Sequence, residues 1–132
     1  KEVGTLGAFP LPVEVIPFGW TASQALIEEA LVSMDVMGRQ ITLRMDGDAA
    51  YRTDEGNFIL DLHLTRIGNP RQLALILNQI PGVVENGLFI DICDQVVIGY
   101  GDGRVEVRDI NAGTTSEEQI ALAENDNLFR DI

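Results

Sequence analysis

The single histidine of this sequence, His63, stands two positions after Asp61 in a stretch where apolar and polar residues alternate. Residues two apart on a strand share one face, so this carboxylate and imidazole could act as an acid–base pair. When the opposite face of such a strand is apolar, the polar face usually meets water or a neighbouring subunit. We therefore favour a surface or interface role for His63, with the acid–base pair as the alternative.

Three further groups of residues have a spacing that suggests chemistry, and each has a simpler explanation. Asp46, Asp48 and Asp54 resemble a calcium loop, but its glycine and closing glutamate are not in register, which favours solvated turn residues. Cys93 has no histidine or basic neighbour in sequence, which suits a buried or inert thiol. The glycines of residues 99–103 precede a β-rich stretch rather than a helix that could hold phosphate, so we predict a turn. We expect no metal site from these residues.

The composition is that of a folded, acidic protein. Its 132 residues carry 21 acidic and 9 basic side chains, a formal net charge of −12, and 45% of them are hydrophobic. This charge repels polyanions and the arginines are scattered singly, so we expect no nucleic-acid partner. No apolar run approaches membrane-spanning length, so we expect no membrane partner. One cysteine and the lack of a signal-peptide pattern fit the cytoplasm.

The first predicted element is a strand at residues 11–16. Proline cannot donate to a ladder, so Pro10, Pro12 and Pro17 confine regular pairing to this stretch and mark bends at its ends. Residues 1–10 show no clear period, and we interpret them as a connector whose fold depends on what precedes it.

Two amphipathic helices are predicted, at residues 21–34 and 69–80. Thr21 or Ser23 could accept a hydrogen bond from the free amides in the first turn of the first helix. In the second helix, Asn69 followed by proline is a strong start signal.

Strands with one apolar face are predicted at residues 40–45, 58–64 and 83–90. Within the last of them, Asn86-Gly87 could mark a hairpin turn, but we favour one strand with a kink. The resulting β-α-β-β-α-β order over residues 11–90 is that of an α+β, ferredoxin-like unit. Both helices can cover the same face of its antiparallel sheet, which leaves the other face half polar.

Residues 91–110 do not belong to that unit. Two β segments flank Gly101-Asp-Gly103, whose Asp-Gly favours a tight hairpin, and one face of this hairpin needs a partner surface elsewhere. Residues 111–132 are interpreted as a loosely attached acidic tail. Within this tail, Thr115-Ser-Glu-Glu118 resembles the capping box of a short helix.

Three runs of residues resemble the type A ribose-5-phosphate isomerases in their order, their spacing and their amino-acid sequence. With the helices between them, they cover about residues 1–110. The resemblance implies that residues 11–90 are the family's small domain. It also implies that the hairpin of residues 91–110 would complete the Rossmann-like large domain. The three runs are Phe9-Pro-Leu-Pro-Val-Glu-Val-Ile-Pro-Phe18, Thr53-Asp-Glu-Gly-Asn-Phe-Ile-Leu-Asp61 and Ile80-Pro-Gly-Val-Val-Glu-Asn-Gly-Leu-Phe89.

The resemblance implies an aldose–ketose isomerase of the pentose phosphate pathway, which interconverts ribose 5-phosphate and ribulose 5-phosphate through an enediol without any cofactor. Enzymes of this family begin with a segment that holds the phosphate loop and the glutamate general base, and this sequence matches neither. We therefore expect a fragment without its catalytic N-terminal half, which is inactive by itself and contains no catalytic residue. Lys1 aligns with a family lysine near the substrate, which implies substrate binding; a solvated terminal lysine is the alternative.

The resemblance further implies a homodimer or homotetramer. Two other functions stay open from the residues alone. A stand-alone ferredoxin-like module could bind a small ligand on its half-polar sheet face, or it could use that face to oligomerise.

Overall fold

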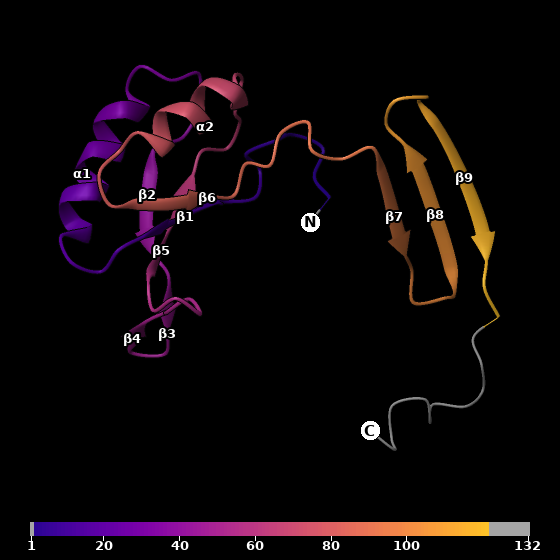
Figure 1. The fold of residues 1–132 in the computed structure, drawn as a ribbon, viewed down its shortest axis with the longest axis horizontal. Coiled ribbons are helices and arrows are strands. Elements are labelled where there is room, and N and C mark those ends of the chain that lie inside the picture. The colour runs from indigo at the N-terminus through magenta and orange to yellow at the C-terminus, as the bar shows by residue number, and fades with distance from the viewer. Residues whose placement is uncertain (1, 122–132) are drawn as a thin grey trace. The chain divides into compact units, whose positions relative to one another are not determined.

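The computed structural model describes residues 2–121, which combine helices and antiparallel sheets. The chain divides into two compact units, Lys1–Ile90 and Asp91–Ile132. The first unit contains both helices and a four-stranded sheet, and the second contains a three-stranded sheet (Figure 1).

The sheet of the first unit has the strand order β2-β5-β1-β6, with antiparallel pairing between all neighbours. Its central strand β1 pairs with β5 so that Leu11 lies opposite Leu62 and Val13 lies opposite Leu60. These apolar pairs form the sheet side of the core. The strands are β1 (Leu11–Val15), β2 (Gln40–Leu43), β5 (Phe58–His63) and β6 (Val83–Asn86).

A proline is unusual in a central strand, and the end of β6 explains why Pro12 is tolerated. The Pro12 carbonyl accepts a hydrogen bond from the Gly87 amide at 2.9 Å, so this edge of Pro12 faces the point where the β1–β6 ladder stops. A Cβ on Gly87 would lie 2.8 Å from the Pro12 ring, so only glycine fits here. Asn86-Gly87 therefore ends β6, and both our single strand over residues 83–90 and the hairpin alternative were wrong.

Helices α1 (Trp20–Leu31) and α2 (Pro70–Asn78) lie over the same face of the sheet, as predicted (Figure 1). Their buried side chains join those of the strands in a single core. This arrangement follows from their one-sided apolar pattern, because each helix has only one stripe to bury. The core consists of Leu11, Val13, Val15, Ile27, Leu31, Leu60, Leu62, Leu64, Ile67, Leu73 and Leu77.

The two helix starts differ from each other. Asn69 caps α2 as predicted, since its side chain accepts a hydrogen bond from the Gln72 amide at 3.2 Å. The predicted cap of α1 was wrong, because its N-cap is Gly19 in the left-handed conformation without a side-chain cap bond. Ser23 instead is buried and donates to the Pro81 carbonyl at 2.8 Å, which ties α1 to the turn before β6.

The strand predicted at residues 40–45 is interrupted. β2 ends at Leu43, and a small hairpin of β3 (Met45–Asp46) and β4 (Ala49–Ala50) follows it. Gly47 forms the turn of this hairpin at a φ of 61°, in the region that favours glycine.

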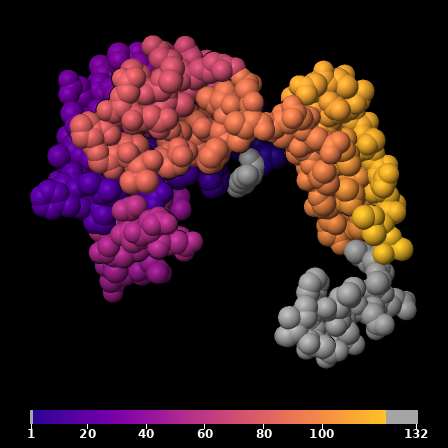
Figure 2. Space-filling view, in the orientation of Figure 1, coloured from indigo at the N-terminus to yellow at the C-terminus, as the bar shows by residue number. Residues whose placement is uncertain are grey.

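The second unit is a three-stranded sheet with the order β7-β8-β9 (Figure 1), and its atoms are orange to yellow in Figure 2. Its strands are β7 (Gln95–Gly99), β8 (Arg104–Asp109) and β9 (Thr114–Gln119). The predicted hairpin is confirmed as β7 and β8. The short helix in the acidic tail was wrong in the described residues, since β9 pairs with β8 from Thr114 to Gln119. Residues 122–132 of the predicted tail lie outside the described residues.

Substitution of two leucines of α2 tests the assigned core. Leu77 is fully buried, whereas Leu75 is 64% exposed on the same helix. We expect Leu77→Ala to lower the free energy of unfolding by about 2–5 kcal/mol, because it removes buried methyl groups and leaves a cavity. The matched control Leu75→Ala should change it by less than about 0.5 kcal/mol. Urea unfolding followed by Trp20 fluorescence measures both, and equal losses would contradict this core.

Candidate functional site

The face of the first sheet that the helices do not cover carries a row of hydrogen-bonded polar side chains. On β1, one carboxylate oxygen of Glu14 accepts from the Thr53 hydroxyl at 2.7 Å and from the Asn57 amide at 3.1 Å. Both donors come from the loop before β5, so Glu14 holds this loop against the sheet.

Asp61 on β5 has an arginine partner. The Arg44 guanidinium donates two hydrogen bonds to it, at 3.0 Å from Nε to Oδ2 and 2.7 Å from Nη2 to Oδ1. These hydrogen bonds raise the pKa of Arg44, partly opposed by burial. The fork geometry fixes both side chains along the sheet surface.

His63 shares the face of Asp61 but bonds to another residue. Its Nε2 lies 2.8 Å from the Thr42 hydroxyl. Because Asp61 is engaged by Arg44, the structure does not bring the two residues together as an acid–base pair. Sequence reasoning missed the role of Arg44, although its alternation with Thr42 places it on this face beside Asp61.

The connector region at residues 2–10 lies beside two cavities of the first unit. One, of about 330 Å³, is lined by Gly7, Ala8, Pro10, His63 and Thr65. The other, of about 280 Å³, has a mostly apolar lining that includes Gly7, Leu88 and the prolines of the connector and β1. Lys1, the predicted substrate-binding residue, lies outside the described residues, so its role stays a prediction.

The remaining sequence candidates form no site in the described part of the chain. Residues 2–121 contain no group of three or more His, Cys, Asp or Glu residues placed to hold a metal ion. Cys93 is exposed, which contradicts a buried thiol, and its Sγ lies 3.1 Å from the Gln95 carbonyl oxygen. The predicted turn is confirmed by Gly103 at a φ of 86° between β7 and β8.

The described helices include none that is long and apolar enough to cross a membrane. The longer of the two, α1, has 12 residues.

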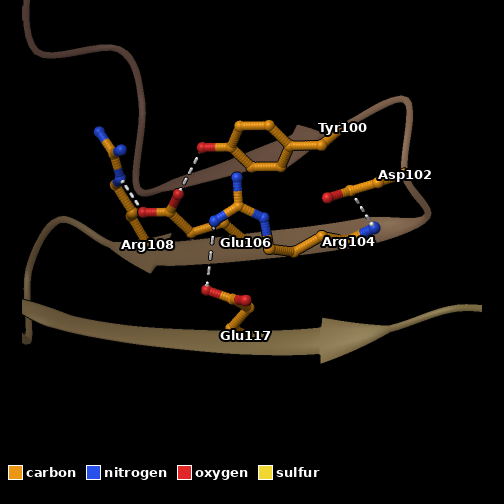
Figure 3. A network of polar contacts seen from close by, with 6 residues as sticks. All are labelled: Tyr100, Asp102, Arg104, Glu106, Arg108 and Glu117. Carbon is orange, nitrogen blue, oxygen red and sulfur yellow. Dashed lines mark hydrogen bonds and ion pairs between the residues drawn. The ribbon is translucent and has the colours of Figure 1, made fainter.

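A polar network covers one face of the second sheet (Figure 3). The Glu106 carboxylate accepts from the Tyr100 hydroxyl at 2.8 Å and from Nε of Arg108 at 2.6 Å. Arg104 stacks over the Tyr100 ring at 3.8 Å and lies 3.8 Å from a Glu117 oxygen. These contacts join β8, β9 and Tyr100, the residue that directly follows β7. The network connects neighbouring strands, and both oxygens of its Glu106 carboxylate are already bonded.

Comparison with known proteins identifies this architecture. The sequence profile of ribose 5-phosphate isomerase A (phosphoriboisomerase A) matches residues 1–103. Curated relatives named "Ribose-5-phosphate isomerase A" are 76% identical in Ruegeria sp. (strain TM1040) and 72% identical in Ruegeria pomeroyi, each over all 132 residues. The chain covers 50% of each of these two, so it spans about half the length of the curated relatives it matches.

Solved structures agree with the sequence matches. The ribose 5-phosphate isomerase A of Methanocaldococcus jannaschii aligns with a TM-score of 0.64 at 34% identity, over 81% of this chain and 44% of that one. A D-ribose-5-phosphate isomerase solved in complex with phospho-erythronic acid aligns with a TM-score of 0.63 at 39% identity over the same shares. The chain is thus a mixed helix-and-sheet portion of a sugar-phosphate isomerase fold. It belongs to the ribose 5-phosphate isomerase A family, as its three motif runs indicated.

The Glu106 network predicts a pH dependence. Hydrogen bonds from Arg108 and then Tyr100 lower the pKa of Glu106 from its ordinary value of 4.5. A carboxyl whose folded pKa is depressed stabilises the fold above its unfolded pKa, and this stabilisation is lost as pH falls through the folded pKa. We therefore expect the second sheet to lose stability as the pH falls below 4.5.

A carboxyl NMR titration should give Glu106 a midpoint below 4.5, and Arg108→Ala should raise this midpoint more than Tyr100→Phe. Glu106→Gln serves as the control, because it should remove this part of the pH dependence. A midpoint that neither variant moves would contradict the network.

Proposed function

We propose that the whole protein is a ribose-5-phosphate isomerase of the pentose phosphate pathway, and that this chain supplies its small domain and part of its large domain. Its reaction is the aldose–ketose interconversion of ribose 5-phosphate and ribulose 5-phosphate through an enediol. The observation that carries the proposal is the 76% identity over all 132 residues to a relative of that name.

The described residues support a catalytic base that belongs to another segment of the protein. Abstraction of a carbon-bound proton needs a carboxylate positioned at the substrate and free to accept that proton. Glu14 and Asp61 point from the open sheet face, but each is already held by hydrogen bonds from neighbouring side chains. We therefore assign the base to a part of the protein outside this chain.

Within this proposal the first unit is a ferredoxin-like small domain. Two features support it: the β-α-β-β-α-β order of its main elements, with the β3–β4 hairpin as an insertion, and the strand order β2-β5-β1-β6. Both helices on one face of an antiparallel sheet are the packing expected of this fold.

The second unit is assigned to the Rossmann-like large domain. Val97 is opposite Val107 and is 61% exposed, on the face of the sheet opposite Tyr100 and Glu106. Its neighbour on the same face is Val105, so a valine patch lies on a layer that no helix of its own unit covers within the described residues. Such a patch is the surface that a large domain would bury.

The substrate and partners follow the family. Lys1 is assigned to bind the phosphate or hydroxyls of the sugar, because a lysine there supplies a charge that recognises an anion. No cofactor is assigned. We place the protein in the cytoplasm and expect a homodimer or homotetramer, in which the open sheet face with His63 and Asp61 contributes to the subunit contact.

An isomerase assay tests the activity. A full-length protein that contains this sequence should convert ribose 5-phosphate, whereas the 132-residue chain should be slower by at least about 10²-fold, since it lacks the positioned base. The full-length variant Asp61→Asn is the matched control and should keep its turnover. Equal rates for the chain and the full-length protein would place the base within these residues, and an inactive full-length protein would refute the assigned activity.

Sedimentation tests the subunit contact. We expect Thr42→Arg on the open face to shift the full-length protein toward smaller species, because it adds bulk and charge at the proposed interface. Glu28→Arg on the exposed side of α1 is the control and should leave the mass unchanged. A dimer or tetramer that resists Thr42→Arg would exclude this face from the interface.

A further inference from the structure

The segment of residues 2–8 is fixed to the first unit at Leu6 and Gly7. The Leu6 carbonyl accepts a hydrogen bond from the Ile67 amide at 2.8 Å. Gly7 is buried at a φ of +102°, and a Cβ there would lie 3.0 Å from three backbone atoms of Arg66. Two main chains therefore touch here, at a position that excludes any side chain.

The backbone that receives this segment is itself strained. Thr65 has a φ of 65°, which is unfavourable for a β-branched residue, and the Arg66 amide donates to the Leu64 carbonyl at 2.6 Å across it. A hydrogen bond between residues two apart around a positive φ defines a tight γ-turn of the rare, strained kind. We call residues 64–66 the γ-turn. Strain of this kind persists only where the surroundings enforce it.

Residues 35–38 hold the strained turn in place. The Gly38 amide donates to the Leu64 carbonyl at 2.8 Å, and a Cβ on Gly38 would lie 2.3 Å from the His63 carbonyl oxygen. Asp35 adds an ion pair to Arg66 and accepts from the Gly68 amide at 2.8 Å through its carbonyl. The γ-turn is thus held by residues 35–38 as well as contacted by Gly7.

Gly7 also lines both cavities of this unit, at about 330 and 280 Å³. Within residues 5–8, the Ala8 amide donates to the Thr5 carbonyl at 3.1 Å. The Gly7–Arg66 contact and the Leu6–Ile67 hydrogen bond attach this stretch to the turn and to the residue after it.

We propose that Gly7 is a positioning residue for sugar-phosphate binding, which acts by seating residues 2–6 on the γ-turn of residues 64–66 and on Ile67. The inference rests on the proposed function, in which the lysine directly before this segment binds the substrate. The strained turn then provides a fixed reference point on the small domain for a binding group at the start of the chain.

Gly7→Ala in the full-length protein tests this inference. The added methyl group has no room and a strained φ, so we expect the KM for ribose 5-phosphate to rise about tenfold with little change in kcat, the pattern of lost uniform binding. Gly4→Ala is the matched control, because nothing lies within 4 Å of a Cβ at Gly4, and it should leave KM unchanged. Hydrogen exchange of the Ile67 amide should speed up in Gly7→Ala only.

A second variant does not disturb the contact. One extra glycine inserted after Gly4 lengthens the segment before Leu6, where there is open space. It should raise KM while Ile67 exchange stays at the wild-type rate. An active wild-type enzyme whose KM is unchanged by both Gly7→Ala and the insertion would overturn the positioning role. An inactive wild-type enzyme would instead refute the proposed function.

Discussion

The first unit depends on the burial of β1 at the centre of its sheet. Val13 and Val15 are fully buried, and they contact the same core as α1, α2 and β5. Because β1 pairs with β5 on one side and β6 on the other, it also supplies the backbone hydrogen bonds that join the two halves of the sheet. The apolar sides of α1, α2 and the sheet are therefore buried in one core, and β1 lies at the centre of that sheet.

The same strand carries the polar surface. Its alternation sends Val13 and Val15 into the core and Glu14 to the open face, where Glu14 holds the loop before β5. Two further hydrogen-bonded pairs lie on this face, Arg44 with Asp61 and Thr42 with His63. The polar groups of this face are therefore fixed rather than free. The hydrogen bonds of this face are thus satisfied within the unit, which fixes the positions of its side chains.

Periodicity predicted the elements whose apolar residues repeat regularly. It failed where a contact with a residue distant in sequence determines the local structure. Both helices and the β7–β8 hairpin followed from local patterns. The start of α1 did not follow from the local pattern, because the Ser23 hydroxyl donates to the carbonyl of Pro81, which lies 58 positions later in the sequence. Gly87 looked like a turn residue, but it is required because the Pro12 ring lies against it. The clamp around Thr65 likewise depends on distant residues, which no local pattern encodes.

The two edges of the second sheet differ in their side chains. The β9 edge carries Glu117 and Glu118, whereas β7 has no charged residue between Gln95 and Gly99. Charges along an edge discourage pairing with another strand, while an uncharged β-branched edge permits it. Of the two edges, β7 is therefore the one suited to pair with a further strand, whereas the acidic β9 edge disfavours such pairing and with it the stacking of strands into open-ended fibres.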